Sequence, residues 1–446
     1  MQNDLTTGSV FRNVVSFSLP YLLSYFLQTL YGMADLFIIG QFEGVASTTA
    51  VSIGSQVMHM LTVMLVGLAM GATVSIAQAA GGGDKKRTAS AIGNTVTLFM
   101  LLSLALTALL LALRGGIVSI MSTPEEAVQG TLAYLTVCFI GIPFITAYNI
   151  IASIFRGLGD SKSPMYFIAV ACVVNIALDY YFMGTLHLGP AGAALGTTLS
   201  QAVSVLVSLA VILKRRLISV RRADFRPQRA VMGKLLQIGV PVALQDGFIQ
   251  VSFVIITIIA NRRGLTDAAA VGIVEKIIGF LFLIPSSMLS TVSALGAQNI
   301  GAGKPERARL TLRYAAMIAC SFGIAVVILT LFIAEPLVGL FTPDAAVAAA
   351  GGQYLRGYIW DSFFAGVQFS FSGYFCAYGK SGLSFLHNTL SILLVRVPGA
   401  YLASKFFPQT LLPMGLASAC GSLFSILVCV IAYHWLKRQQ KAVLYG

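Results

Sequence analysis

Residues 21–40 read YLLSYFLQTLYGMADLFIIG, a stretch apolar enough to cross a lipid bilayer that nevertheless contains one carboxylate, Asp35. About 20 such residues span the hydrocarbon core of a membrane. A second stretch, YFIAVACVVNIALDYYFMG at 166–184, has the same character and contains Asp179. A charged Asp at the centre of a spanning helix costs roughly 2.5–3.5 kcal/mol, so such residues usually have a function. We expect these two to bind a cation or to carry a proton.

The whole chain has the composition of a polytopic membrane protein. Its 446 residues are 57% hydrophobic and only 10% charged, whereas a soluble domain has about 25% charged residues. The net charge of +13 lies in short loops, which fits the positive-inside rule and excludes nucleic acid as a partner. The six cysteines fall within apolar runs without metal-ligand spacing, so we expect neither structural disulfides nor a cysteine metal site.

Apolar runs of spanning length recur along the chain, and we predict an all-α integral membrane protein with twelve transmembrane helices. They lie roughly at 14–40, 46–79, 89–113, 128–155, 164–184, 191–213, 232–260, 267–296, 310–333, 347–378, 382–405 and 412–436. Lysines and arginines gather in the loops on one side, with Arg262 and Arg263 as a local exception. This bias predicts a multi-pass protein of a bacterial inner membrane with both termini in the cytoplasm.

The two halves of the chain repeat. The tripeptide SLP at 18–20 resembles GVP at 239–241, and AQAAGGG at 77–83 resembles AQNIGAG at 297–303. We therefore predict two six-helix lobes, residues 1–220 and 221–446, related by a pseudo-two-fold axis along the membrane normal. Many secondary transporters consist of such repeats. The basic link between the lobes, 214–234, is either a surface segment that touches anionic lipid or a plain tether.

The carboxylates of the first lobe can form one site. Asn175 and Asp179 are four residues apart and share a helix face. Asp35, Asp179 and Thr197 each lie about six residues, or ~9 Å, from the outer end of a predicted span. Oxygen ligands of this kind suit a small cation such as Na⁺, and two adjacent carboxylates favour holding one proton. The alternative is that each Asp only hydrogen-bonds a neighbouring helix.

The second lobe has ionisable residues of both signs within its spans. They are Asp246, Glu275, Lys276, Asp361 and Arg396. Because bases accompany the acids, internal ion pairs explain them as well as a second ion site or a substrate contact does.

Uncharged polar and aromatic residues on the spans predict a substrate cavity. We expect it to be lined by Gln28, Tyr31, Gln245, Gln250, Phe253, Phe282 and Met288. Such a lining suits bulky amphipathic or cationic solutes, although ordinary helix packing also explains each residue singly. Pro20 either bends its helix as a hinge or occupies the first turn of that helix.

Motifs for other activities are absent from the sequence. There is no GxxxxGK[ST] loop, so we do not expect this chain to drive transport with ATP. GxSxG, HExxH and CxxC are also missing, and the short loops contain no catalytic constellation. We therefore expect a protein that is not an enzyme and has no cofactor apart from a coupling ion.

Taken together, these features resemble the multidrug and toxic compound extrusion (MATE) family, over nearly the whole chain. The resemblance rests on the twelve spans in two halves and on four local motifs. The first is Pro20, Gln28, Tyr31 and Asp35 at the spacing Pro-x7-Gln-x2-Tyr-x3-Asp. The others are FRGLGDS at 155–161, GPAGAA at 189–194 and AQNIGAGK at 297–304.

The resemblance implies an antiporter that exports organic, often cationic, compounds while H⁺ or Na⁺ enters, by alternating access. The family's N-lobe cation site matches Asp35, Asn175, Asp179 and Thr197. Asp361 matches the tenth-span acid of a second site found in some members, but the seventh span has Asp246 and no Glu. We expect drug-like substrates, contact with membrane lipids and a functional monomer. The alternatives are a lipid or lipid-linked oligosaccharide flippase of the same superfamily, a membrane-embedded transferase, and a scaffold.

Overall fold

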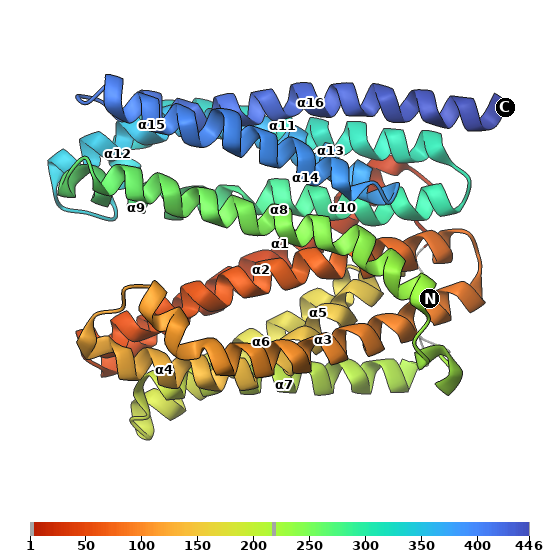
Figure 1. Cartoon of the computed structure of the whole chain (residues 1–446), viewed down its shortest axis with the longest axis horizontal. Helices are drawn as coiled ribbons and strands as arrows, with labels where there is room; N and C mark the ends of the chain where they lie inside the picture. The colour runs from red at the N-terminus through yellow and green to blue at the C-terminus, as the bar shows by residue number, and fades with distance from the viewer. Residues whose placement is uncertain (1–3, 216–219, 446) are drawn as a thin grey trace. The chain divides into compact units, whose positions relative to one another are not determined.

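The structure is a computed structural model that describes residues 4–215 and 220–445, and every regular element within them is a helix (Figure 1). The first half contains α1 (Val10–Phe42), α2 (Val45–Gly81), α3 (Lys85–Ile120), α4 (Glu125–Ile140), α5 (Ile142–Gly157), α6 (Lys162–Asp179), the π-helix η1 (Tyr180–Thr185) and α7 (Gly189–Arg215). The second half contains the 3-10 helix η2 (Arg222–Phe225), α8 (Arg229–Asn261), α9 (Leu265–Leu281), α10 (Leu283–Gly301), α11 (Pro305–Gly339), α12 (Ala345–Tyr358), α13 (Trp360–Ala377), α14 (Ser381–Ser391), the π-helix η3 (Ile392–Arg396), α15 (Val397–Phe406) and α16 (Leu412–Tyr445). The predicted all-α fold is confirmed.

Each of the twelve predicted spans corresponds to one helix or to one run of consecutive helices. Among the described residues, nine helical segments are long and apolar enough to cross a membrane, and α4 with α5, bent by 48°, provides a tenth. The remaining two are α12 with α13, and α14 with η3 and α15. These last two carry the buried charged residues Asp361 and Arg396, which lower their apolar character.

The chain divides into two compact units, and their bounds differ from the predicted lobes 1–220 and 221–446. Unit 1 consists of Met1–Leu5 and Leu19–Val240, and unit 2 of Thr6–Ser18 and Pro241–Gly446. The division therefore falls inside α1 and inside α8, next to the single proline within each helix, Pro20 and Pro241.

Polar contacts explain why the first turns of α1 and α8 belong to the other unit. At the start of α8, the Lys234 Nζ donates to Gln78 Oε1 of α2 at 2.7 Å. The same turns lie so close to α2 that a Cβ added at Gly71 would be 2.1 Å from the Leu235 carbonyl oxygen. In unit 2, the Ser287 Oγ donates to the carbonyl oxygen of Ser18, at the end of the corresponding part of α1, at 3.0 Å.

The described part of the basic link packs on α3. The Asn94 Oδ1 accepts from the Gln228 N–H at 2.7 Å, and the Asn94 Nδ2 donates to the Asp224 carbonyl oxygen at 3.2 Å. The Thr97 Oγ1 donates to the Phe225 carbonyl oxygen at 2.8 Å. Residues 216–219 of the predicted link lie outside the described residues. Over η2 the link is thus bound to unit 1, and its contact with lipid stays a prediction.

Matching turns make the internal repeat visible in the backbone. Gly83, after α2, and Gly303, after α10, both have φ of 70°, and Gly159 and Gly379 have φ of 90° and 70°. Only glycine adopts such angles without strain. Each turn is closed in the same way, since the next N–H returns to a carbonyl five residues earlier, as Asp160 does to Phe155 at 2.8 Å and Lys380 to Phe375 at 2.9 Å.

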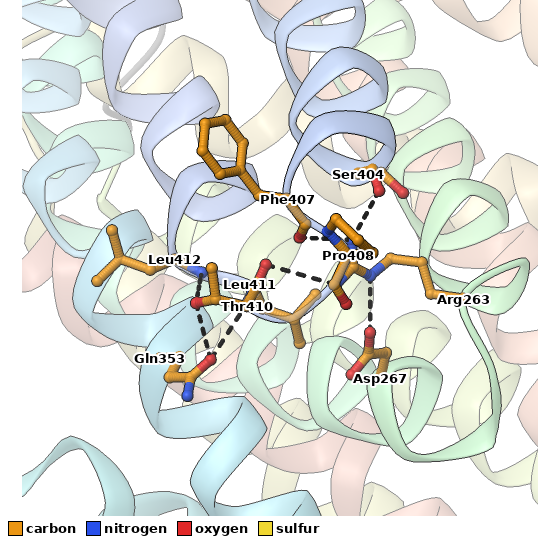
Figure 2. Close-up of polar contacts among 9 residues, drawn as sticks. All are labelled: Arg263, Asp267, Gln353, Ser404, Phe407, Pro408, Thr410, Leu411 and Leu412. Atoms are coloured by element: carbon orange, nitrogen blue, oxygen red, sulfur yellow. Dashed lines mark hydrogen bonds and ion pairs between the residues drawn. The ribbon is translucent and has the colours of Figure 1, made fainter.

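Arg263, an exception to the predicted charge bias, organises the loop between α15 and α16 (Figure 2). Its guanidinium donates to Asp267 at 2.6 Å, to the carbonyl oxygen of Ser404 in the last turn of α15, and to three carbonyl oxygens of the loop, those of Phe407, Pro408 and Thr410, at 2.9–3.4 Å. The Thr410 Oγ1 in turn donates to Gln353 Oε1 of α12 at 2.9 Å. The side chain is only 8% exposed, so its place reflects loop structure and not membrane orientation.

Candidate functional site

Three helices of unit 1 bring the predicted carboxylates together. Asp35 lies on α1, Asn175 and Asp179 on α6, and Thr197 on α7. The Thr197 Oγ1 donates to Asp35 Oδ2 at 2.9 Å, and Asp179 and Asn175 are the other side-chain neighbours of the Asp35 carboxyl group. Asp35 is 2% exposed, and Asn175 and Asp179 are both 0% exposed. The structure thus brings all four predicted residues together, three of them buried and Thr197 half-buried, in what we call the unit 1 cluster.

Local structure positions Asp179 in this cluster. It is the last residue of α6, and the π-helix η1 begins directly after it. π-Helical turns are rare and occur frequently at functional sites. Gly196 on α7 leaves the space that the carboxylate fills, because an added Cβ there would lie 2.0 Å from Asp179 Oδ1. Gly196 was not among the residues predicted from the sequence, although its position directly before Thr197 is a signal.

The unit 1 cluster lacks a counter-charge. None of the ion pairs found among the described residues includes Asp35 or Asp179. Asp35 Oδ1, both carboxylate oxygens of Asp179 and both amide atoms of Asn175 are buried and have no hydrogen-bond partner in the described structure. Two ionised carboxylates can only accept, so the contact between Asp35 and Asp179 becomes a hydrogen bond only when one of them holds a proton.

A second buried cluster lies in unit 2, and we call it the unit 2 cluster. Arg396, at the end of η3, pairs through Nη2 with Asp361 Oδ2 of α13 at 3.6 Å and donates to the Tyr358 hydroxyl. Its guanidinium carbon lies 5.0 Å from the centre of the Phe253 ring. Glu275 of α9 lies near Arg396 and accepts from the Thr257 Oγ1 at 3.1 Å. Of the alternatives left open for the second lobe, the structure shows an internal ion pair for Asp361 and Arg396.

The other two ionisable residues predicted for unit 2 lie apart from this cluster. Lys276 is exposed, because it follows Glu275 directly and so points to another face of α9. Asp246 on α8 is half-buried and is close to Cys376. Of the five residues, Glu275, Asp361 and Arg396 therefore lie together, and a second ion or substrate site that includes any of the five stays a prediction.

A pair of tyrosines that repeat in sequence accompanies the two clusters. Tyr134 of α4 lies near Asp35, and Tyr354 of α12 lies near Glu275, Asp361 and Arg396. Both are buried, at 2% and 0% exposure. Tyr134 and Tyr354 are 220 residues apart, the same separation as between Ala77 and Ala297 of the repeated motifs, and this spacing relates them although it does not by itself assign them to the sites.

The residues predicted to line a substrate cavity are divided between the units. Gln28 and Tyr31 are half-buried on α1 in unit 1, while Gln250, Phe253 and Phe282 are half-buried in unit 2. Gln245 and Met288 are buried inside unit 2, at 1% and 5% exposure. The Phe282 ring packs edge-on against Phe369, with 6.0 Å between the centroids. That these side chains bind substrate stays a prediction.

Pro20 lies inside α1, which begins ten residues earlier at Val10. The alternative that it starts the helix is therefore wrong. The next residue, Tyr21, is held by Arg156 of α5, whose Nη1 donates to the Tyr21 hydroxyl at 3.0 Å and whose guanidinium carbon lies 3.9 Å from the ring centre. Bending of α1 at Pro20 stays a prediction.

Comparison with known proteins identifies the family. The MatE family model matches residues 20–181 and again 241–402, and the two matches begin at Pro20 and Pro241. The probable multidrug resistance protein YpnP of Bacillus subtilis (strain 168) is 30% identical over 437 residues, covering 97% of this chain and 96% of the relative. The probable multidrug resistance protein NorM of Thermotoga maritima is 25% identical over 438 residues, covering 97% and 94%.

Solved structures show the same fold. A crystal structure of MATE in the bent conformation superposes with a TM-score of 0.92 at 22% sequence identity and covers 98% of each chain. The family model matches both halves, and a relative at 30% identity matches nearly the full length. The chain therefore belongs to the MatE family, the multidrug and toxic compound extrusion transporters.

Proposed function

We propose that the protein exports drug-like organic compounds, many of them cationic and amphipathic, while H⁺ or Na⁺ enters through the unit 1 cluster. The names of the relatives, multidrug resistance and multidrug export proteins, support drug export as the general activity. The single observation that supports ion coupling is the pair Asp35 and Asp179, which is buried in a membrane-spanning unit without a basic partner.

Electrostatics explains why such a pair takes up a positive charge. An uncompensated buried charge is strongly unfavourable, and two adjacent carboxylates repel each other when both are ionised. A bound proton removes one of the charges and lets the two carboxyl groups share a hydrogen bond. A bound Na⁺ also balances one charge, and the buried oxygens without partners on Asp35, Asn175 and Asp179 are ligands of the kind it prefers.

Charge at this cluster can be coupled to the drug through α1. This helix carries Asp35, and its own proline marks the point where it passes from unit 2 into unit 1. In our mechanism, an ion arriving from outside neutralises the cluster, α1 bends near Pro20, and a bound cationic drug loses its counter-charge and leaves outward. The emptied protein then turns inward, releases the ion and takes up drug again.

The membrane potential can drive this exchange when the drug is neutral, whereas the exchange of one ion for a drug with one positive charge moves no net charge and depends on the ion's concentration gradient. One positive charge moving inward gains about 2.3 kcal/mol per 100 mV. At about 1.4 kcal/mol for each factor of ten, this supports a roughly fiftyfold gradient of a neutral drug. We place the protein in the bacterial cell membrane with both termini in the cytoplasm, in contact with lipid and active as a monomer.

The contacts of the basic residues favour an exporter over a lipid or lipid-linked oligosaccharide flippase. A flippase would need free cations in its cavity to hold phosphate groups. Arg396 is paired with Asp361, and Lys276 is exposed on α9. Neither is thus available as an internal phosphate ligand.

Efflux by Asp35→Asn tests the proposal. We expect this variant to fold and to bind drug, but to lose efflux of a fluorescent cationic dye from cells and from proteoliposomes with imposed H⁺ or Na⁺ gradients. Glu126→Gln, which removes an exposed carboxylate of the same unit, is the matched control and should export normally. Wild-type efflux by Asp35→Asn would show that the unit 1 cluster does not couple transport to ion entry.

A further inference from the structure

The two units bury comparable sets of acidic and polar groups. The unit 1 cluster combines Asp35 and Asp179 with an amide and the hydroxyl of Thr197. The unit 2 cluster combines the buried Asp361 and the half-buried Glu275 with the hydroxyls of Tyr358 and Thr257. Each cluster has a tyrosine of the repeated pair Tyr134 and Tyr354 nearby, and each adjoins a π-helix. The difference is that, among the described side chains of the two clusters, only the unit 2 cluster contains a basic residue, Arg396.

Arg396 is held among the acids of unit 2 by contacts on several sides. It is 5% exposed, and aromatic rings lie on it, with Phe253 at 5.0 Å and Tyr358 at 5.7 Å from the guanidinium carbon. Its backbone packs against α16 at Gly421, where an added Cβ would lie 3.2 Å from Arg396 Cβ. A guanidinium fixed in this way keeps its charge at every physiological pH.

The positive charge of Arg396 balances the negative charge of nearby carboxylates, as a bound cation would. Asp361 is fully buried, and its carboxylate lies 3.6 Å from the guanidinium of Arg396. Glu275 is the second acidic neighbour of Arg396. The facing groups from the packed helices are therefore Glu275 of α9, Tyr354 and Tyr358 of α12, and Asp361 of α13. Two carboxylates with hydroxyl groups would attract a monovalent cation or a proton if Arg396 were absent.

We propose that the Arg396 guanidinium takes, in unit 2, the place that a coupling ion takes in unit 1, so that unit 2 carries a covalently attached cation and binds no coupling ion. This inference rests on the proposed function of the unit 1 cluster. It assigns ion coupling to one unit only. It also predicts that unit 2 contains a latent ion site, which a neutral side chain at position 396 uncovers.

The test uses the purified full-length protein and Arg396→Met, a change that keeps an unbranched side chain and removes the charge. The background is Asp35→Asn, which silences the unit 1 cluster. Bound Na⁺ is measured with radioactive sodium in choline buffer, and proton uptake is measured with a pH indicator on acidification. We expect Asp35→Asn alone to gain neither ion at unit 2. Asp35→Asn with Arg396→Met should bind Na⁺ or take up a proton with at least about tenfold higher affinity, because the fixed positive charge is gone.

Two further variants separate a new ion site from a general disturbance. Arg396→Lys keeps the charge and should behave as Asp35→Asn alone. Adding Asp361→Asn to the Arg396→Met protein removes the acid and should abolish the gain. The inference is overturned if folded Arg396→Met protein gains neither ion, or if Arg396→Lys gains one.

A separate measurement covers the case in which Arg396→Met does not fold. If Asp35→Asn with Arg396 intact binds an ion that Asp361→Asn removes, unit 2 already has an ion site and the inference is wrong, whereas the absence of such an ion supports it. The proposed function has its own readout, because it fails when Asp35→Asn retains dye efflux, whatever happens at Arg396.

Discussion

The unit 1 cluster and the unit 2 cluster each contain two acidic residues and a threonine, but only the unit 2 cluster contains a basic residue. In unit 1, Asp35 and Asp179 have only neutral partners, Asn175 and Thr197. In unit 2, Asp361 faces the guanidinium of Arg396. A buried acid that forms an ion pair with a basic residue of the same chain contributes to the stability of the fold. A buried acid without one must obtain its positive charge from outside the chain, and this dependence lets an ion gradient act on it.

The backbone around each cluster suggests how the two halves diverged. The fifth span of each half contains a π-helix, η1 after Asp179 and η3 ending at Arg396. A π-helical turn shifts the direction of the following side chains relative to an α-helix. The same local feature thus follows a carboxylate in one unit and presents a guanidinium in the other.

Removing one acid from each cluster should give the largest difference between the two units. Asp361→Asn leaves Arg396 buried without its ionised partner, so we expect the free energy of unfolding to fall by about 3–5 kcal/mol. Asp179→Asn removes an unpaired acid, so we expect stability to stay equal or to rise while efflux is lost. Chemical unfolding of both variants in one detergent, with dye efflux in parallel, measures the two effects.

A double variant provides the control for this prediction. Asp361→Asn combined with Arg396→Met removes both charges of unit 2 together, and it should recover most of the stability that Asp361→Asn loses. If Asp361→Asn is as stable as the wild type, or if Asp179→Asn is the less stable of the two, the assignment of a structural pair to unit 2 and an ion site to unit 1 is reversed.

Gly196→Ala tests whether the position of Asp179 determines ion affinity, because it changes no charge. The new Cβ would lie 2.0 Å from Asp179 Oδ1, so the carboxylate must move away from Asp35. Overpacking of this kind typically costs about 1–3 kcal/mol, and if this cost falls on the ion-bound state, ion affinity decreases by about fivefold to about 140-fold. The concentration of ion that gives half-maximal efflux is the measurement.

Gly116→Ala is the matched control for Gly196→Ala. Gly116 lies on α3 of the same unit, and an added Cβ there meets nothing within 4 Å. It should leave the ion dependence unchanged. Equal ion dependence of Gly196→Ala and Gly116→Ala would mean that the position of Asp179 does not matter for coupling.

The unit 1 cluster could be predicted from the sequence because its causes are local. Buried acids interrupt long apolar runs, the i, i+4 spacing puts Asn175 and Asp179 on one face, and helix rise gives the depth of Thr197. Each step needs only a regular helix of known direction. The helical architecture followed from the same apolar periodicity.

Features that depend on tertiary packing could not be predicted in this way. The unit boundary lies inside α8 and not at 220, because the contact of Lys234 with Gln78 joins residues far apart in sequence. Which of the adjacent residues Glu275 and Lys276 lies near Arg396 needed the orientation of α9. The close approach of Gly196 to Asp179 needed the distance between α6 and α7, which no composition or spacing contains.

The smallest expected difference comes from a pair of threonines with the same chemical role. The Thr197 Oγ1 donates to Asp35 in unit 1 at 2.9 Å, and the Thr257 Oγ1 donates to Glu275 in unit 2 at 3.1 Å. Replacing either with valine removes one hydroxyl at nearly constant volume, and a typical hydrogen bond contributes about 1 kcal/mol. We expect Thr197→Val to change the half-maximal ion concentration for dye efflux about fivefold. Thr257→Val should leave that concentration unchanged, because the positive charge beside Glu275 belongs to the chain. An equal change in both variants would mean that the two clusters take part in ion coupling alike, and that Arg396 does not distinguish them.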